Sequence, residues 1–295
     1  MNCKYMCPIL TSFSENGSVS YDDMHAMYDQ ILDAGIDGIL VGGSSGEFYA
    51  LNFEEVQSLI KDAVQYINHK GFVLAGTGRM MESETIHLSN FALDNGADAV
   101  IVVGPYYTAC NEEDVFHYYD HILSGIYGKV YIYNYIERTG YDVTVNTMLR
   151  LLAKHNNLAG VKDTHMILRH TQRYIQEVKS KYPNFQVFTG YDNHCIPVIL
   201  SGGDGCIGAL SNVFPELGCK VVEALKNENI AELITLQRSI DKYMKMYELH
   251  TPFNPVMKWV MKQMGKPMQE YCSEPLTPLS DKEKEVLFPI VKELF

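Results

Sequence analysis

The feature that most constrains this chain is a regular alternation of short apolar segments with longer amphipathic ones, from residue 5 to residue 209. The short segments are apolar runs bounded by turn-forming residues, a pattern typical of buried strands in a parallel sheet. The predicted strands cover residues 5–13, 36–41, 72–76, 97–103, 130–134, 158–164, 185–189 and 205–209. Because eight such strands alternate with helix-like segments, the sequence predicts an α/β fold, a (β/α)8 TIM barrel.

The segments between the strands carry apolar residues at helical spacing, and Ser20 and Asn52 are plausible caps for the first two. These predicted helices cover residues 19–34, 53–67, 83–94, 112–124, 145–154, 166–181 and 194–201. A doubly wound open sheet is the alternative fold. It lacks its usual support here, because no GxGxxG motif follows the first strand and no GKS or GKT phosphate loop is present.

From residue 215 onward the pattern changes to helices alone, punctuated by prolines. The predicted helices there cover residues 216–227, 230–248, 255–264 and 281–294. We therefore expect two parts: a (β/α)8 catalytic domain over residues 1–214, and a C-terminal helical extension over residues 215–295 that packs on the barrel.

Charge and composition exclude several classes of function. The formal net charge is −12, and nucleic-acid binding requires basic patches, so we expect no nucleic-acid partner. The N-terminus shows no signal-peptide core and no apolar run approaches membrane-spanning length, so we expect no membrane association. The seven cysteines are scattered without metal-type spacing, which predicts neither disulfides nor a zinc site. These features predict a soluble, cytoplasmic protein.

A lysine stands where the sixth predicted strand ends. Residues 158–164 read LAGVKDT, so an apolar run leads directly into Lys162. A buried ammonium loses hydration, which lowers its pKa and makes the free amine available near neutral pH. Such an amine can attack a ketone and form a Schiff base. Taken alone, the motif favours the simpler interpretation, a lysine that marks the solvated end of a strand, because structural ion pairs are common.

Other polar and aromatic residues also follow predicted strands, and in a barrel these positions converge on the active site. The GGSSGE turn at residues 42–47 offers close backbone approach, N–H groups and hydroxyls to a carboxylate, although turn chemistry alone also explains it. Tyr133 could shuttle protons beside Lys162 or could simply pack in the core. Arg138 could bind a carboxylate in bidentate fashion or lie solvated in its loop. Residues 190–194 (GYDNH) suit sugar hydroxyls and equally a helix cap.

Together these motifs resemble the dihydrodipicolinate synthase / N-acetylneuraminate lyase family of pyruvate-dependent class I aldolases, over essentially the whole chain. The resemblance is carried by five motifs on successive predicted strands: GGSSGE at residues 42–47, GPYY at 104–107, YN and RTG within 133–140, GVKD at 160–163 and GYDN at 190–193.

The resemblance implies a catalytic role for Lys162, Tyr133, Ser45 and Tyr107. Lys162 forms the Schiff base with pyruvate or a 2-oxo acid, and Tyr133 is the acid/base at the bond made or broken. Ser44 and Ser45 correspond to a Thr/Ser pair that holds the pyruvate carboxylate and relays protons. Tyr107 completes this relay from a neighbouring subunit of a homotetramer. The iminium acts as the electron sink, so the resemblance implies no metal and no organic cofactor beyond the covalent Schiff base.

Departures from the family pattern favour one branch. The KDT sequence that starts at Lys162 differs from the lysine–glutamate–alanine usual in the synthase, and Asn193 and Ala209 replace the residues with which lyases bind sialic acid. Residues 190–194 and 249–253 look most like 2-keto-3-deoxygluconate aldolases. The implied substrates are pyruvate and an aldehyde, joined as a 2-keto-3-deoxy sugar acid. The candidate substrate-binding residues are Ser44, Ser45, Gly46, Arg138, Thr164, Gly190, Asp192, Asn193 and Ile207.

Alternatives remain within this reading and outside it. Arg138 is a synthase-like feature, so 4-hydroxy-tetrahydrodipicolinate synthase, which condenses pyruvate with aspartate semialdehyde, stays open, as does N-acetylneuraminate lyase. A sugar-acid dehydratase would use the same Schiff base to expel water. A non-catalytic 2-oxo acid sensor or structural tetramer is the alternative from another class; the intact Lys162, Tyr133 and serine pair count against it.

Overall fold

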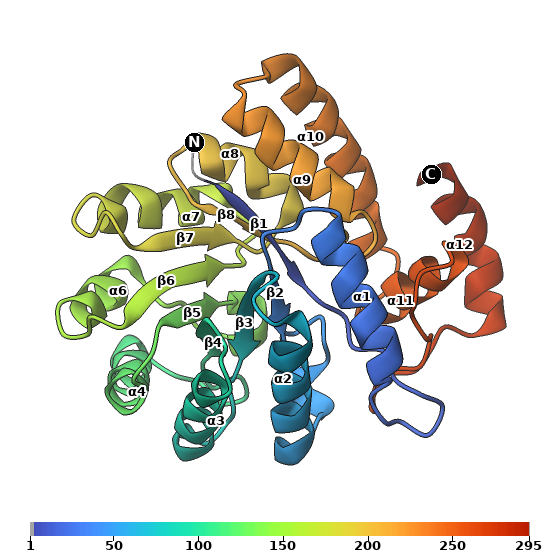
Figure 1. Cartoon of the computed structure of the whole chain (residues 1–295). Helices are drawn as coiled ribbons and strands as arrows, with labels where there is room; N and C mark the ends of the chain where they lie inside the picture. Colours follow the sequence, from blue (N-terminus) through green and yellow to red (C-terminus); the bar gives the residue numbers. More distant parts are fainter. Residues whose placement is uncertain (1–2, 295) are drawn as a thin grey trace.

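The computed structural model describes residues 3–294 as a closed barrel of eight parallel strands in sequence order, surrounded by helices (Figure 1). The predicted TIM barrel is thereby confirmed. Met1 and Asn2, the start of the N-terminus in which we expect no signal peptide, lie outside the described residues. The strands are β1 (Lys4–Pro8), β2 (Gly38–Val41), β3 (Phe72–Gly76), β4 (Ala99–Val103), β5 (Val130–Asn134), β6 (Leu158–Asp163), β7 (Gln186–Thr189) and β8 (Gly205–Ile207).

Side chains alternate between the two faces of the barrel wall, as the pleat of a strand requires. The inner face is filled by a separate cluster that includes Met6, Leu40, Leu74, Ile101, Tyr131, Tyr133, Phe188 and Ile207. The outer face packs against the helices in the main hydrophobic core. Neighbouring residues of one strand therefore meet different surroundings, which becomes important for β5 and β6.

Two predicted strands run more than one residue too far at their carboxyl ends. The first ends at Pro8 rather than at residue 13, because beyond it the Leu10 N–H donates to the Asn212 side chain (2.9 Å) instead of to a strand. The eighth ends at Ile207, after which a short 3-10 helix (Ala209–Asn212) begins. Both departures lie at the carboxyl ends of the strands, where the chain leaves the sheet to build the mouth of the barrel.

The helices of the outer layer agree closely with the prediction. In the second, Asn52 forms a capping box with Glu55, whereas Ser20 precedes the first helix without a side-chain capping bond. The predicted helix over residues 166–181 is instead α7 followed by a π-helical turn (Tyr174–Lys179). The helices are α1 (Tyr21–Asp33), α2 (Phe53–Ile67), α3 (Glu82–Asp94), α4 (Glu112–Gly125), α5 (Ile136–Thr139), α6 (Val145–Leu152), α7 (Leu168–Arg173) and α8 (Cys195–Leu200).

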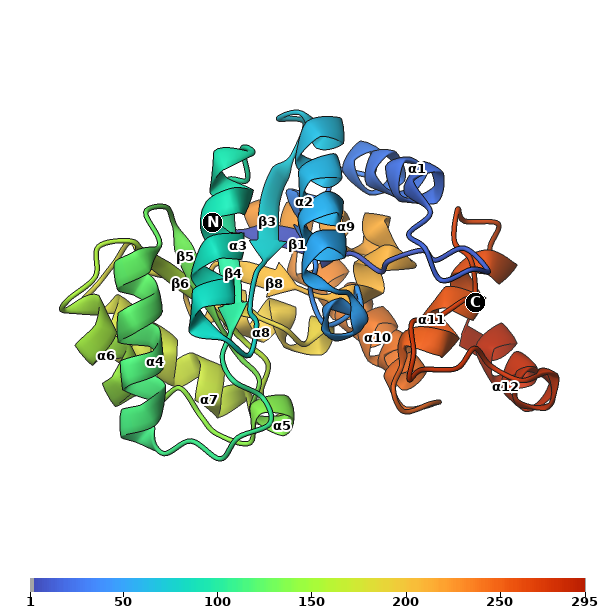
Figure 2. The same cartoon turned by 90° about the horizontal axis from the view of Figure 1, so that it is seen from below.

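Four further helices follow β8, namely α9 (Pro215–Lys226), α10 (Ile230–Met244), α11 (Asn254–Gln263) and α12 (Asp281–Leu294). Helix α9 packs on β1 and on α10, which gives it the position of the barrel's eighth helix. Helices α11 and α12 lie beside the barrel rather than around it (Figure 2). The division at residue 215 stays a prediction, and the packing of α9 favours a boundary after it.

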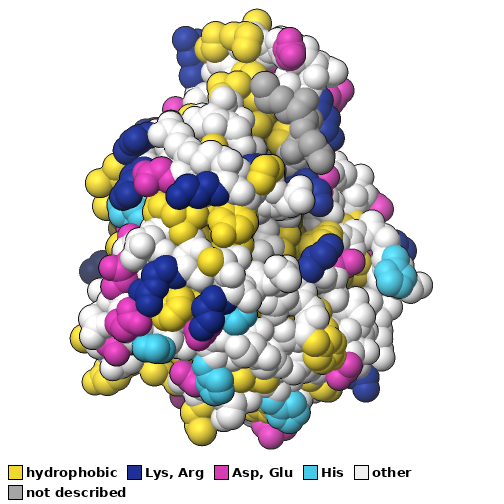
Figure 3. All heavy atoms as spheres, turned by 90° about the vertical axis from the view of Figure 1, so that its left-hand side faces the viewer, with side chains coloured by type: hydrophobic (Ala, Val, Ile, Leu, Met, Phe, Trp, Pro, Cys, Tyr) yellow, Lys and Arg dark blue, Asp and Glu magenta, His cyan; other side chains and the backbone are white. Residues whose placement is uncertain are grey.

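Surface charge is mixed where the α6 and α7 side faces the viewer. Lysine and arginine side chains there lie among aspartate, glutamate and histidine side chains (Figure 3). No helix within residues 3–294 is long and apolar enough to cross a membrane.

Candidate active site

A cavity of about 190 Å³ opens at the carboxyl ends of the barrel strands. It brings together most of the residues predicted from the sequence: Ser44, Ser45, Tyr133, Arg138, Lys162, Thr164, Gly190 and Ile207. The remaining lining includes Tyr135, Tyr191 and Ala209 near strand ends, and Tyr247, His250, Thr251, Pro252 and Phe253 from the chain that leads into α11. The cavity combines apolar surface with many convergent polar side chains, a lining that suits a small polar molecule.

Lys162 is buried at the end of β6 and faces the inside of the barrel, with 5% of its surface exposed. Its Nζ atom lies 4.3 Å from the centroid of the Tyr133 ring. Burial lowers the pKa of Lys162 to about 8, although the Asp192 carboxylate opposes this shift. At pH 7 roughly one such lysine in ten is a free amine, against fewer than one in a thousand for an ordinary lysine.

Tyr133 is the register partner of Lys162 across the β5–β6 pair and is equally buried. Burial raises the pKa of its phenol to about 12, while the side chains of Thr164 and Ser44 act in the opposite direction. Tyr133 therefore carries its proton when Lys162 is a free amine. The Thr164 hydroxyl is buried beside this pair and makes no hydrogen bond of ordinary geometry within residues 3–294, so a ligand could satisfy it.

The loop after β2 presents two serines to the cavity. The Gly46 N–H donates to the Gly43 carbonyl (3.0 Å) and the Glu47 N–H to the Ser44 carbonyl (3.2 Å), so these amides are used within the turn. The Thr11 hydroxyl donates to the Gly46 carbonyl (2.8 Å). Gly46 therefore shapes the loop without lining the cavity, whereas Ser44 and Ser45 line it.

Helix α11 supports this loop from outside the barrel, a contribution that the sequence did not reveal. Asn254 Nδ2 donates to the Ser45 carbonyl (2.8 Å). Lys258 Nζ lies 2.6 Å from Glu47 Oε1, and both side chains are completely buried. Glu47 Oε2 also accepts from the Ser273 amide (2.7 Å) and hydroxyl (2.6 Å). The buried charges are thus paired and hydrogen-bonded, as their burial requires.

Two further predicted residues, Arg138 and Gly190, lie in the wall of the cavity. Arg138 is exposed on α5, with its guanidinium 5.7 Å from the centroid of the Tyr135 ring. Gly190 closes the opposite wall so tightly that a Cβ atom there would lie 1.8 Å from Thr164 Oγ1 and 3.2 Å from Lys162 Cε. A glycine is therefore required at position 190 on steric grounds.

Asp192 and Asn193, predicted to meet sugar hydroxyls, are not brought to the cavity. The Asp192 carboxylate is buried and accepts from the hydroxyls of Tyr5 and Tyr247, the latter at 2.8 Å. The Asn193 carbonyl accepts from the Gln237 side chain (3.0 Å) at the contact with α10. Asp192 acts on the site only through its charge and through Tyr247, because its oxygens are engaged away from the cavity.

Tyr107 does not reach the cavity of its own chain. Its side chain is 93% exposed on the loop after β4. A role for Tyr107 at another subunit's site stays a prediction.

Comparison with known proteins places this geometry in context. A model of the dihydrodipicolinate synthetase family matches residues 2–294. The Escherichia coli protein YagE, named as a 2-dehydro-3-deoxy-D-gluconate aldolase, is 31% identical over 97% of this chain and 95% of its own. The crystal structure of YagE in complex with pyruvate superposes with a TM-score of 0.95, covering 99% of this chain and 98% of that one.

Two further relatives differ in the activity that their names state. Escherichia coli YjhH, named as a 2-dehydro-3-deoxy-D-pentonate aldolase, is 32% identical over 94% of this chain and 92% of its own. A 4-hydroxy-tetrahydrodipicolinate synthase of Hydrogenobaculum is 31% identical over 95% of each chain. Identity alone does not separate the two activities.

Proposed function

The chain belongs to the dihydrodipicolinate synthetase family, and we propose that it is a class I aldolase that cleaves or forms a 2-keto-3-deoxy sugar acid through a Schiff base on Lys162. Family membership makes it a lyase; the Schiff-base residue and the sugar acid are the proposal. The observation that carries it is a buried lysine with a lowered pKa whose amine lies 4.3 Å from the Tyr133 ring, in a cavity at the barrel mouth.

In the cleavage direction, the Lys162 amine attacks the C2 ketone and expels water, which leaves an iminium. The C3–C4 bond then breaks, its electron pair forms an enamine, and the C4 hydroxyl loses its proton as the aldehyde leaves. Protonation at C3 and addition of water release pyruvate and restore the amine. Water lost in the first step is regained in the last, so the net change is one sugar acid to pyruvate and one aldehyde.

Tyr133 is the acid/base that this sequence of steps needs. Its raised pKa keeps the phenol protonated at neutral pH, so in the condensation direction it holds a proton that it can pass to the aldehyde oxygen. In cleavage it must first lose its proton, and a cationic iminium on Lys162, whose Nζ lies over the Tyr133 ring, favours the phenolate because opposite charges attract. Ser44 and Ser45 line the same cavity and can hold the substrate carboxylate and pass the proton on.

The names of YagE and YjhH support a 2-keto-3-deoxy sugar acid as the substrate class. Beyond Lys162 the cavity offers the hydroxyls of Thr164 and Tyr191, which can hydrogen-bond to the hydroxyls of a short sugar chain. Arg138 at the rim can meet a distal carboxylate if the substrate carries one.

Borohydride trapping tests the proposal. The protein is reduced with borohydride in the presence of pyruvate, and intact mass and peptide mapping locate any adduct. We expect a pyruvate-sized adduct on Lys162, and Lys162→Ala should give none. A folded wild-type protein that forms no adduct would contradict the Schiff base. Aldehydes of two to four carbons are then offered with pyruvate, and the products identify the sugar acid.

The second candidate is 4-hydroxy-tetrahydrodipicolinate synthase, favoured by Arg138 at the cavity rim and by the Hydrogenobaculum relative. The two activities share the pyruvate adduct and differ in the aldehyde. Pyruvate with aspartate semialdehyde should give no cyclic product if the aldolase proposal is correct, whereas efficient turnover of that pair would favour the synthase.

A further inference from the structure

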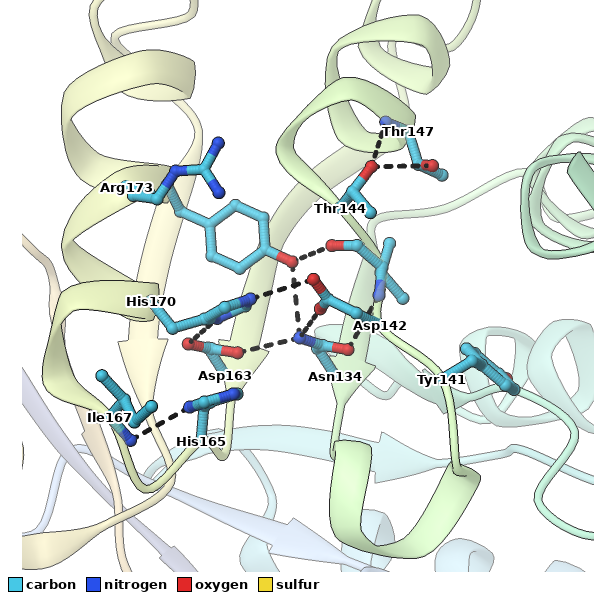
Figure 4. Close-up of polar contacts among 12 residues, drawn as sticks. Asn134, Tyr141, Asp142, Thr144, Thr147, Asp163, His165, Ile167, His170 and Arg173 are labelled. Carbon is cyan, nitrogen blue, oxygen red and sulfur yellow. Dashed lines mark hydrogen bonds and ion pairs between the residues drawn. The ribbon is translucent and has the colours of Figure 1, made fainter. Parts of the chain in front are cut away.

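A buried polar network lies behind the catalytic pair, on the outer face of the barrel wall (Figure 4). Asn134 follows Tyr133 on β5 and Asp163 follows Lys162 on β6, so both point outward when the catalytic side chains point inward. Asn134 Nδ2 donates to Asp163 Oδ1 across the two strands (3.0 Å). The residues that adjoin Tyr133 and Lys162 are therefore joined directly to one another.

Helix α7 holds the β6 end of this network. Asp163 Oδ2 accepts from the Thr171 hydroxyl (2.6 Å) and contacts His170 Nδ1 (3.0 Å). His170 Nε2 lies 3.1 Å from Asp142 Oδ2, so the imidazole bridges two carboxylates. Burial lowers the pKa of His170, but its bonds to Asp142 and Asp163 raise it to about 10. The imidazole is consequently cationic at neutral pH and donates from both nitrogens.

The loop between α5 and α6 holds the β5 end. Asn134 Nδ2 also donates to Asp142 Oδ1 (2.9 Å), and Asn134 Oδ1 accepts from the Val143 N–H (3.0 Å). The Tyr174 hydroxyl donates to the Val143 carbonyl. Nearly every donor and acceptor of the network is thus used, and its centre at Asn134 and Asp163 is buried, so the network favours one arrangement over its alternatives.

The pairing of β5 with β6 is irregular, so additional side-chain bonds between these strands have a structural role. The register shifts near the start of the strands, where Val130 pairs with Leu158 but Tyr131 pairs with Gly160. A shift of this kind inserts an unpaired residue and bends the strand. The backbone hydrogen bonds at the start of β5 and β6 therefore constrain the relative position of Tyr133 and Lys162 less well. The side-chain bond between Asn134 and Asp163, at the carboxyl ends of the strands, lies directly beside those two residues.

We propose that Asn134, Asp163 and His170 are positioning residues that fix the ends of β5 and β6 and thereby set the approach of Tyr133 to Lys162. This inference rests on the proposed function. None of the three touches the cavity, and the serine loop that would hold the substrate carboxylate follows β2, away from the network. Loss of the network should therefore slow the steps that need both Tyr133 and Lys162 and leave binding of the 2-oxo acid nearly unchanged.

The test compares Asp163→Asn and His170→Gln with Arg173→Ala. Arg173 lies on the same helix and forms an exposed pair with Glu177, so it is a matched control outside the network. We expect kcat for the aldol reaction to fall at least tenfold in the first two variants, with KM for the 2-oxo acid within about threefold. Arg173→Ala should stay within twofold in both. Thr171→Val removes a single hydrogen bond and keeps the shape, so it remains informative if the charged variants fold poorly; there we expect a two- to fivefold fall in kcat.

Borohydride trapping of pyruvate separates this proposal from the proposed function. If the wild-type protein forms the Lys162 adduct and folded network variants turn over within twofold of it, the positioning role is overturned. A rise of tenfold or more in KM with unchanged kcat would overturn the positioning role as well, because the network would then act on substrate binding. Adduct retained with kcat lost supports it. A wild-type protein without any adduct refutes the proposed function itself.

Discussion

The barrel interior destabilises the protonated form of Lys162, because the buried ammonium loses its hydration. In the unfolded chain its pKa is that of an ordinary lysine, and in the folded protein burial lowers it to about 8. Between about pH 8 and 10.5 the unfolded state binds more protons than the folded state, so the stability that Lys162 costs is recovered as pH rises through this window. Below pH 8 the full penalty applies.

We therefore expect Lys162→Met to abolish activity and to raise the free energy of unfolding by about 1–3 kcal/mol at pH 7. The gain should shrink as pH rises from about 8 to 10.5, because the folded-state amine has already lost its proton and the unfolded-state amine loses its own across this range. Urea denaturation at pH 7 and pH 10 measures both values. If the variant and the wild type differ by the same free energy of unfolding at both pH values, the pKa of Lys162 is not lowered in the folded protein.

Gly190 is fixed by the space that Thr164 and Lys162 leave. We expect Gly190→Ala to reduce kcat by tenfold or more, because a Cβ would lie 1.8 Å from the Thr164 hydroxyl and one of the two must move. Gly190→Ala combined with Thr164→Ala removes the clashing oxygen and should recover thermal stability. If the single variant has wild-type kcat and melting temperature, the wall of the cavity is not as tight as described.

At the scale of elements, the serine loop after β2 (residues 42–47) depends on helix α11. Lys258→Met should destabilise the protein by about 3–5 kcal/mol, because it leaves the Glu47 carboxylate buried without its cation. Glu47→Gln combined with Lys258→Met removes both charges and should recover most of that loss. Chemical denaturation measures the three variants. Lys262→Ala is the control on α11: it removes a long contact (3.5 Å) between an exposed lysine and Glu270, which keeps its pair with Lys284, so stability should change by less than 1 kcal/mol.

Features that depend on neighbouring residues could be predicted from the sequence, whereas contacts between distant parts of the chain could not. Strand and helix positions follow from local periodicity, and β3, β5, α2 and α12 have the predicted bounds. The cavity residues at strand ends follow from the barrel topology. The supports from Asn254 and Lys258 carry no local signal, since they contact residues more than 200 positions away. Asp192 was assigned to the cavity from its position after β7, but position does not fix where a side chain turns, and Tyr5 and Tyr247 hold its oxygens.

At the scale of the whole molecule, a single chain leaves the proposed proton relay incomplete. Tyr107 is 93% exposed and lies outside its own cavity, so a catalytic role for it requires a second copy of the chain. The homotetramer implied by the resemblance would supply one. Sedimentation velocity tests the assembly, and a species of four times the 33.4 kDa chain mass is the expected result.

Subunit mixing tests the shared site directly. Lys162→Ala and Tyr107→Phe should each have low activity alone, because one lacks the nucleophile and the other the relay hydroxyl. In a mixed assembly, a Tyr107→Phe subunit keeps its own Lys162 and can receive an intact Tyr107 from a Lys162→Ala neighbour, so complete sites re-form. We expect activity several times the sum of the separate variants after the two are unfolded together and refolded. Refolding Lys162→Ala with Lys162→Met is the control and should give none. Activity no higher than the sum, in mixed assemblies of confirmed composition, would show that Tyr107 does not act across the interface, and the relay would then have to end within one chain at Ser44 and Ser45.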